Sequence, residues 1–163
     1  MAITRLNNSA VSAVSSLPNL ASLPSAIDVG KVGQVVTAVY DTDSQSTSSS
    51  SFVQIGPSLS ITPSATSSKI FVQVHGGSVY TASDKNGKFS IFRGSTNLGN
   101  TNGFYAHFAN QSYLLSGISM SVLDSPSSTS AITYATYVKT SSGPVSFQDN
   151  TTRTVITAME ILA

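Results

Sequence analysis

Short runs of alternating apolar and polar residues constrain this chain more than any other feature of its sequence. In residues 69–75, KIFVQVH, every second residue from Ile70 to Val74 is apolar, and His75 falls on the polar parity. A period of two is the pattern of a β-strand with one buried and one wet face. Similar runs, rich in β-branched residues, follow one another from residue 33 onward. We therefore expect about nine short strands, no helix, and an all-β sandwich or barrel.

Turn signals separate these runs. A Gly-Pro pair at 56–57 predicts a turn between two strands, and a Gly-Gly pair at 76–77 predicts a bulge or a close backbone approach. Residues 84–87, DKNG, predict a hairpin whose Asn-Gly pair forms a type I′ turn. The polar tracts 41–51 and 94–111 are expected to be loops.

One type of corner occurs twice. Residues 59–74, LSITPSATSSKIFVQV, end one alternating run at a proline and begin another after a Ser/Thr cluster, and residues 126–130, PSSTS, repeat this arrangement. Proline fixes φ and extends the residue before it, while serine and threonine hydroxyls can cap freed backbone groups locally. Both segments are therefore expected to redirect strands at the ends of a sandwich.

Composition excludes several classes of protein. Hydrophobic residues make up 40% of the 163 residues, which is enough for a core, but charged residues make up only 9%. The polar surface comes instead from 32 Ser and 17 Thr. The net charge is +1 and no basic cluster exists, so nucleic-acid binding is not expected. No run approaches the ~20 apolar residues that span a bilayer, so membrane insertion is not expected.

The first 30 residues differ from the rest. Their apolar residues are mostly Ala and Leu, and Pro18 and Pro24 interrupt any regular element. The same interruptions argue against a signal peptide. We expect residues 1–30 to form an extended N-terminal arm for attachment or oligomer contact, and residues 31–163 to form one β-sandwich domain.

No arrangement of residues predicts catalysis, and we expect no catalytic, metal or cofactor-binding residues and no cofactor. His75 and His107 lack partners at metal-binding spacing, and residues 41–52 lack the glycine and the final glutamate of a calcium loop. No Gly-x-Ser-x-Gly or phosphate-binding glycine motif is present. A hydrolase built on two carboxylates that meet only in space stays open as an alternative.

One segment carries residues suited to binding. Aromatic and imidazole rings gather among the Asn and Gly residues of 94–113: Phe104, Tyr105, His107, Phe108 and Tyr113. Exposed on a loop, such rings would meet a sugar or a protein epitope. The alternative is a small satellite core under a long loop, and the sequence leaves both open.

The last segment, TRTVITAMEILA (152–163), is apolar on both parities. Such a strand is expected to be buried on both faces, either in a core or at a subunit contact.

In their order along the chain, the motifs MAITRLNN, GKVGQVV, LSITPSATSSKIFVQV, VLDSPSSTSAITYATYVK and TRTVITAMEILA resemble short virion proteins of tailed phages of marine bacteria and cyanobacteria. The closing strands also look like a jelly-roll of the C1q/TNF type. The resemblance implies a jelly-roll-like antiparallel β-sandwich, a likeness to homotrimeric modules, and a structural role on the virion without enzymatic activity.

The partners implied are other copies of the chain and other virion proteins, either major capsid or tail proteins. Capsid decoration (cement) and a tail-fibre component both fit. A receptor- or carbohydrate-binding module that recognises a host surface glycan is the alternative.

Overall fold

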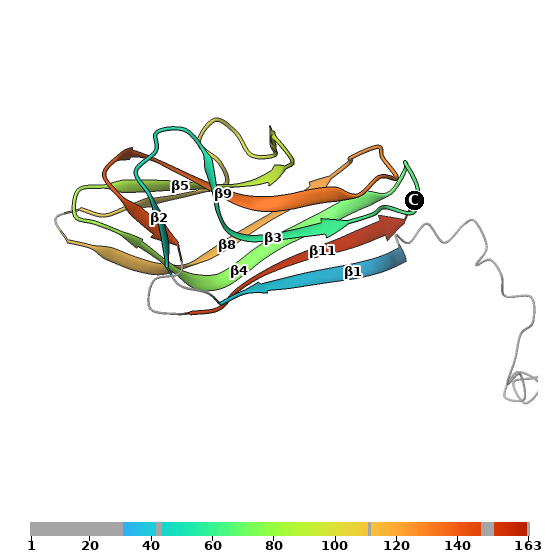
Figure 1. Ribbon diagram of the computed structural model, residues 1–163, viewed down its shortest axis with the longest axis horizontal. Helices are drawn as coiled ribbons and strands as arrows, with labels where there is room; N and C mark the ends of the chain where they lie inside the picture. Colours follow the sequence, from blue (N-terminus) through green and yellow to red (C-terminus); the bar gives the residue numbers. More distant parts are fainter. Residues whose placement is uncertain (1–30, 42–43, 111, 148–151, 163) are drawn as a thin grey trace, which may run out of the picture.

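The computed structural model describes residues 31–41, 44–110, 112–147 and 152–162, which form two packed antiparallel sheets (Figure 1). These residues contain strands and no helix, so the all-β prediction is confirmed. The strands are β1 (Lys31–Tyr40), β2 (Gln45–Thr47), β3 (Val53–Ile61), β4 (Lys69–Thr81), β5 (Asn86–Arg93), β6 (Thr96–Asn97), β7 (Tyr105–Phe108), β8 (Leu114–Asp124), β9 (Ile132–Ser142), β10 (Val145–Phe147) and β11 (Thr154–Leu162).

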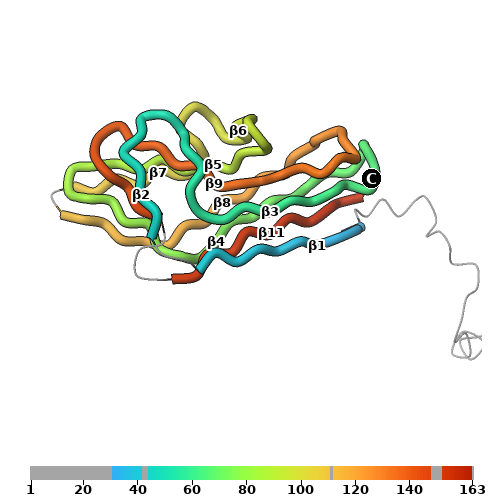
Figure 2. Tube along the Cα trace, viewed as in Figure 1, coloured from blue at the N-terminus to red at the C-terminus, as the bar shows by residue number. Residues whose placement is uncertain are grey.

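The strand order is that of a jelly roll. Six strands form sheet A, in which β11 lies between β1 and β4, β8 pairs with β4, and β10 joins β4 to β2. Five strands form sheet B, in which β9 lies between β3 and β5, and β5 also pairs with β6 and β7. The tube in Figure 2 shows the chain passing between the two sheets. Each sheet alternates strands from early and late in the chain, as a double Greek key requires: sheet A has the order β1-β11-β4-β8, and sheet B has the order β3-β9-β5-β7.

The core lies between the sheets and follows the predicted parity. Ile70, Val72 and Val74 of β4 are fully buried, while His75 is exposed. Large rings fill the space opposite, including Phe89 of β5, which lies 6.2 Å from Phe147 between ring centroids. Apolar burial on this scale is the main source of stability for a sandwich that has no disulfide.

Both predicted corners carry the chain from one sheet to the other. Residues 62–68 lead from β3 in sheet B to β4 in sheet A, and residues 125–131 lead from β8 back to β9 in sheet B. Local capping is present, since the Ser130 amide donates to Ser128 Oγ at 3.0 Å. The first corner, however, is held chiefly by Glu160, which is distant in sequence.

Two turn predictions are wrong. Gly56 and Pro57 do not end a strand but form a bulge inside β3, where Gly56 has φ +87° and the register with β9 shifts. The buried hydroxyl of Thr136 donates to the Ile55 carbonyl at 2.6 Å, which keeps the interrupted strand attached to β9. A tertiary hydrogen bond thus replaces the ladder bonds that the bulge disrupts.

The second error concerns the hairpin between β4 and β5. The hairpin exists, but its left-handed residue is Asp84, with φ +59°, and Asn86 and Gly87 already belong to β5. A Cβ on Gly87 would lie 2.6 Å from Val145 Cγ2. Gly87 therefore serves close packing inside the sandwich, not the turn.

The bulge predicted at Gly76-Gly77 is confirmed. Both glycines have positive φ, the register with β8 shifts there, and the Gly77 amide donates to the Arg153 carbonyl at 2.7 Å. A Cβ on Gly77 would lie 2.0 Å from Thr154 Oγ1, so the backbones need glycine to approach this closely.

The tracts expected to be loops contain the short strands β2, β6 and β7. The predicted N-terminal arm, residues 1–30, lies outside the described residues.

Candidate functional site

The predicted ring segment divides between the surface and the interior. Phe108 on β7 and Tyr113 just before β8 are 63% and 66% exposed, and Phe104 is 38% exposed. The ring of Tyr113 stacks on Tyr80 with centroids 5.9 Å apart, so it is fixed and still accessible. These three rings are placed as a surface-binding loop requires.

Tyr105 and His107 face inward from the same strand. His107 is 3% exposed, and its ring nitrogens are hydrogen-bonded to the Thr81 hydroxyl at 2.7 Å and the Ser116 hydroxyl at 3.1 Å. Burial lowers the pKa of His107 below its usual range, which favours the neutral ring. The Ser116 hydroxyl also contacts the Tyr105 hydroxyl at 3.1 Å. These two residues join β7 to sheet A, so they form the satellite core of the segment, while Phe104, Phe108 and Tyr113 are exposed.

Phe108 and Tyr113 lie at one end of the sandwich together with two leucines. We call Phe108, Tyr113, Leu114 and Leu115 the distal patch. Phe108 pairs with Asn86 and Leu114 pairs with Thr81, so both flank the β4–β5 hairpin. The opposite end of β4 pairs with Ile161, which also pairs with Val32 at the start of β1. Because β4 has 13 residues, about 40 Å separate the distal patch from the point where residues 1–30 join the domain.

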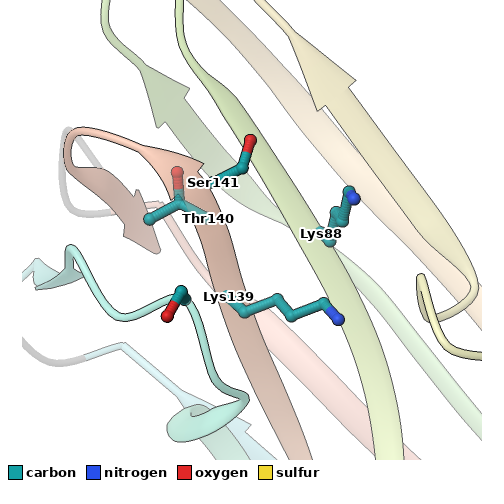
Figure 3. Close-up of a pocket in the computed structure, with 5 residues that line it drawn as sticks. Lys88, Lys139, Thr140 and Ser141 are labelled. Atoms are coloured by element: carbon teal, nitrogen blue, oxygen red, sulfur yellow. The ribbon is translucent and has the colours of Figure 1, made fainter.

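A second candidate site lies on the outer face of sheet B. The residues that line it, which we call the lysine pocket, are Ser50, Lys88, Lys139, Thr140 and Ser141 (Figure 3). Its volume is about 100 Å³. Lys88 of β5 and Lys139 of β9 are direct cross-strand partners, and Figure 3 shows their side chains running to the same side of the strands. The sequence pattern did not bring the two lysines together, because the pairing register of β5 with β9 was not predictable.

Two buried carboxylates were missed as well. Glu160 on β11 is 1% exposed and Asp124 at the end of β8 is 8% exposed, and each stands at one of the two corners. Neither carboxylate stood out from the sequence. The available signal was that Glu160 falls on the same parity as the apolar Ile156 and Ala158.

Within the described ranges, no three His, Asp or Glu residues gather closely enough to hold a metal ion. The same residues include no helix of the length and apolarity needed to cross a membrane. Comparison with protein-family models and with curated proteins found no match to this chain.

Proposed function

We propose that the chain is a non-enzymatic structural protein of a bacteriophage virion. It associates as a homotrimer and is attached to the particle through residues 1–30, as a capsid decoration or tail-fibre component, with the distal patch facing outward. The observation that carries this proposal is an apolar row exposed on the outer face of sheet A, beside the point where residues 1–30 join the domain.

This row crosses the four adjoining strands of sheet A. Val35 pairs with Met159, Met159 with Phe71, and Phe71 with Leu123, so the four side chains lie side by side on one face. Val35 and Leu123 at its two ends are 55% and 53% exposed. We call these four residues the sheet A row. The next outer-face row along the strands, Thr37, Thr157, Gln73 and Ser121, is polar.

A second copy of the chain is the occupant that best fits this face. A row of Val, Met, Phe and Leu that is exposed at its two ends and half-buried between them favours association, because burying it removes apolar area from water. Its low charge lets identical copies meet without repulsion, since the outer face of sheet A carries hydroxyl and amide groups next to the row. The two-sided apolar pattern of β11 is thereby explained: Ile156 and Ala158 face the core, and Met159 faces the contact.

The attachment point and the distal patch lie at opposite ends of the domain, which supports a particle-bound role. If the domain is attached at the end where β1 begins, at Lys31, the distal patch is about 40 Å from the attachment point and can contact solvent or a host surface. Dense strands, tight corners and a low content of charge also suit a surface that must resist proteolysis in many copies.

The test of association is the mass in solution. Multi-angle light scattering of the full chain should give about three times 16.9 kDa, and the Phe71→Glu variant should give a monomer because a charge would be buried in the contact. The control is Thr96→Glu on β6 of sheet B, which is exposed and should leave the mass unchanged. A monomeric unmodified chain would overturn the proposed assembly.

Antibody labelling of virions tests where the chain is located on the particle. Gold-labelled antibody against residues 31–163 should decorate intact virions of the phage that encodes the chain. Label on the head assigns capsid decoration, label on the tail assigns a fibre component, and unlabelled virions exclude both.

Recognition of a host surface glycan is the second candidate function, and the distal patch favours it. If the patch binds the host, free protein added before infection should reduce phage adsorption, and the double variant Phe108→Ser/Tyr113→Ser should not. Val39→Ser, which removes an exposed apolar side chain outside the ring segment, is the control. Equal inhibition by the double variant and the unmodified protein would contradict this role for the patch.

A further inference from the structure

The lysine pocket brings two like charges together on the outer face of sheet B. Lys88 and Lys139 stand directly opposite each other in the β5–β9 ladder. Like charges in this position destabilise a sheet, because their side chains start only about 5 Å apart. An arrangement that costs stability on a surface with few charges calls for a compensating group.

Both ammonium groups are held in place by the same loop. Lys88 Nζ donates to Asn102 Oδ1 at 2.9 Å, and Lys139 Nζ donates to the Thr101 carbonyl at 2.7 Å. Lys139 Nζ also lies 4.5 Å from the centre of the Phe52 ring, within cation–π range. Each ammonium has three N–H groups, so two donors per lysine are left after the loop contact. The pair is therefore preorganised and retains hydrogen-bonding capacity.

The charge of the pair is not neutralised by a carboxylate in the part of the chain that the structure describes. Ion pairs there join Arg93 to Asp124 and Arg153 to Asp41, and neither involves the two lysines. The contacts to Asn102 and Thr101 are to neutral oxygen atoms. A ligand that supplied negative charge would relieve the repulsion and form charge-assisted hydrogen bonds.

We infer that the lysine pocket binds the sulfate or carboxylate group of an acidic saccharide. About 100 Å³ accommodates one such group and excludes a whole drug-sized ligand, so the rest of the molecule must lie outside. Ser50 and Ser141 at the pocket supply hydroxyl groups of the kind that bond to sugar hydroxyls. Tyr137, two residues from Lys139 on the same face of β9, stacks on Phe92 with ring centroids 3.9 Å apart.

This inference goes beyond the structural role and does not depend on it, because the pocket is on sheet B and the sheet A row is on the other sheet. A chain that proves to be monomeric could still bind the saccharide, and a trimer could fail to bind it. Light scattering reports on the first proposal and ligand titration reports on the second, so the two can fail separately.

The experiment titrates the full chain by calorimetry with four probes at low and high salt: a sulfated oligosaccharide, an oligogalacturonate, a neutral oligosaccharide of the same length, and inorganic sulfate. Both acidic saccharides should bind, with affinity falling as salt rises. The neutral saccharide should not bind measurably, and inorganic sulfate should bind more weakly than the sulfated saccharide.

Substitution of the two lysines tests whether the acidic saccharide binds in the lysine pocket. Lys88→Gln and Lys139→Gln should each weaken acidic saccharide binding about tenfold, the loss expected for one charge-assisted hydrogen bond. Lys69→Gln removes one exposed lysine from sheet A and should leave affinity unchanged. Without ligand, the melting temperature should change little in either pocket variant, because relief of the like-charge repulsion offsets the loss of the loop contact. Loss of binding without loss of stability is a result that a purely structural lysine would not give.

Three results would each overturn the inference. Equal affinity for the neutral and acidic saccharides would exclude recognition of charge. Unchanged affinity in both pocket variants would place any binding elsewhere. Inorganic sulfate binding as tightly as the sulfated oligosaccharide would leave a simple anion site without saccharide recognition.

Discussion

Replacing Glu160 by alanine is expected to lower the free energy of unfolding by about 3 kcal/mol. The carboxylate accepts hydrogen bonds at 2.7 Å from the Ser64 amide, the Ser64 hydroxyl and the Gln34 side-chain amide. These donors come from the first corner and from β1, so Glu160 on β11 ties three segments together. Without the carboxylate, these part-buried donors lose their acceptor and the corner loses its anchor.

The contribution of Glu160 should depend on pH. Hydrogen bonds from Ser64, then from Gln34, lower the pKa of Glu160 from 4.5 to about 2. The Ser68 hydroxyl, which is buried nearby without a hydrogen bond of good geometry, contributes in the same direction. Because the pKa is lower in the folded state, the stabilisation is complete above about pH 5, declines as the pH falls below 4.5, and is lost once the pH passes below about 2.

Urea denaturation of the unmodified chain and of Glu160→Ala between pH 7 and pH 2 measures both effects. The difference between the two should shrink towards low pH. Asp41→Asn is the matched control, because Asp41 forms an exposed ion pair with Arg153 that should contribute at most about 1 kcal/mol. A difference that is constant with pH would show that the charge of Glu160 does not hold the corner.

Replacing Asp124 by alanine is expected to cost a similar amount, about 3 kcal/mol, at the second corner. Asp124 accepts two hydrogen bonds from Arg93 Nη1 at 2.9 and 3.0 Å, and one from the Tyr134 hydroxyl at 2.7 Å. Arg93 is 30% exposed and can regain water, whereas Tyr134 is fully buried and cannot. Most of the loss should therefore come from the orphaned Tyr134 hydroxyl.

Two further variants separate these contributions. Tyr134→Phe removes the hydroxyl together with its need for an acceptor and should cost only about 1 kcal/mol. In the Tyr134→Phe background, Asp124→Ala should then cost clearly less than it does alone. Burial, followed by the hydrogen bond to Asp124, raises the pKa of Tyr134 well above its usual value, so the phenol stays protonated throughout such measurements. Equal costs of Asp124→Ala in both backgrounds would contradict the assigned role of the hydroxyl.

The two corners share part of their design. Each is a proline followed by a Ser/Thr cluster, each carries the chain between sheets, and each has a buried carboxylate beside it. Glu160 bonds directly to Ser64 of the first corner, whereas Asp124 precedes the second corner and bonds to Arg93 and Tyr134 of sheet B. The serines that sequence reasoning assigned to local capping do cap locally in part, yet Ser64 bonds to a residue 96 positions away. The repeated corner segment therefore redirects strands, and contacts with residues distant in sequence contribute to holding it in place.

Local chemistry accounts for what the sequence predicted correctly. Alternation in KIFVQVH placed Ile70, Val72 and Val74 in the core, because the side-chain period of a strand is set by its own backbone. The Gly76-Gly77 bulge was also readable, since only glycine adopts such conformations without strain. The turn predicted at Gly56-Pro57 was wrong. An isolated pair of this kind favours a turn, but the Thr136 hydroxyl of another strand bonds to the segment and holds it as a bulge inside β3.

The candidate sites depended on contacts that no local pattern contains. A ring on β7 faces solvent or the interior according to strand parity and pairing, which separated exposed Phe108 from buried His107. Lys88 and Lys139 meet only because β5 and β9 pair in one particular register. The sequence by itself determined strands, corners and an all-β class, because those follow from backbone sterics and apolar periodicity. Only the tertiary structure decided which side chains share a face, because strand register and sheet order come from packing between residues far apart in the chain.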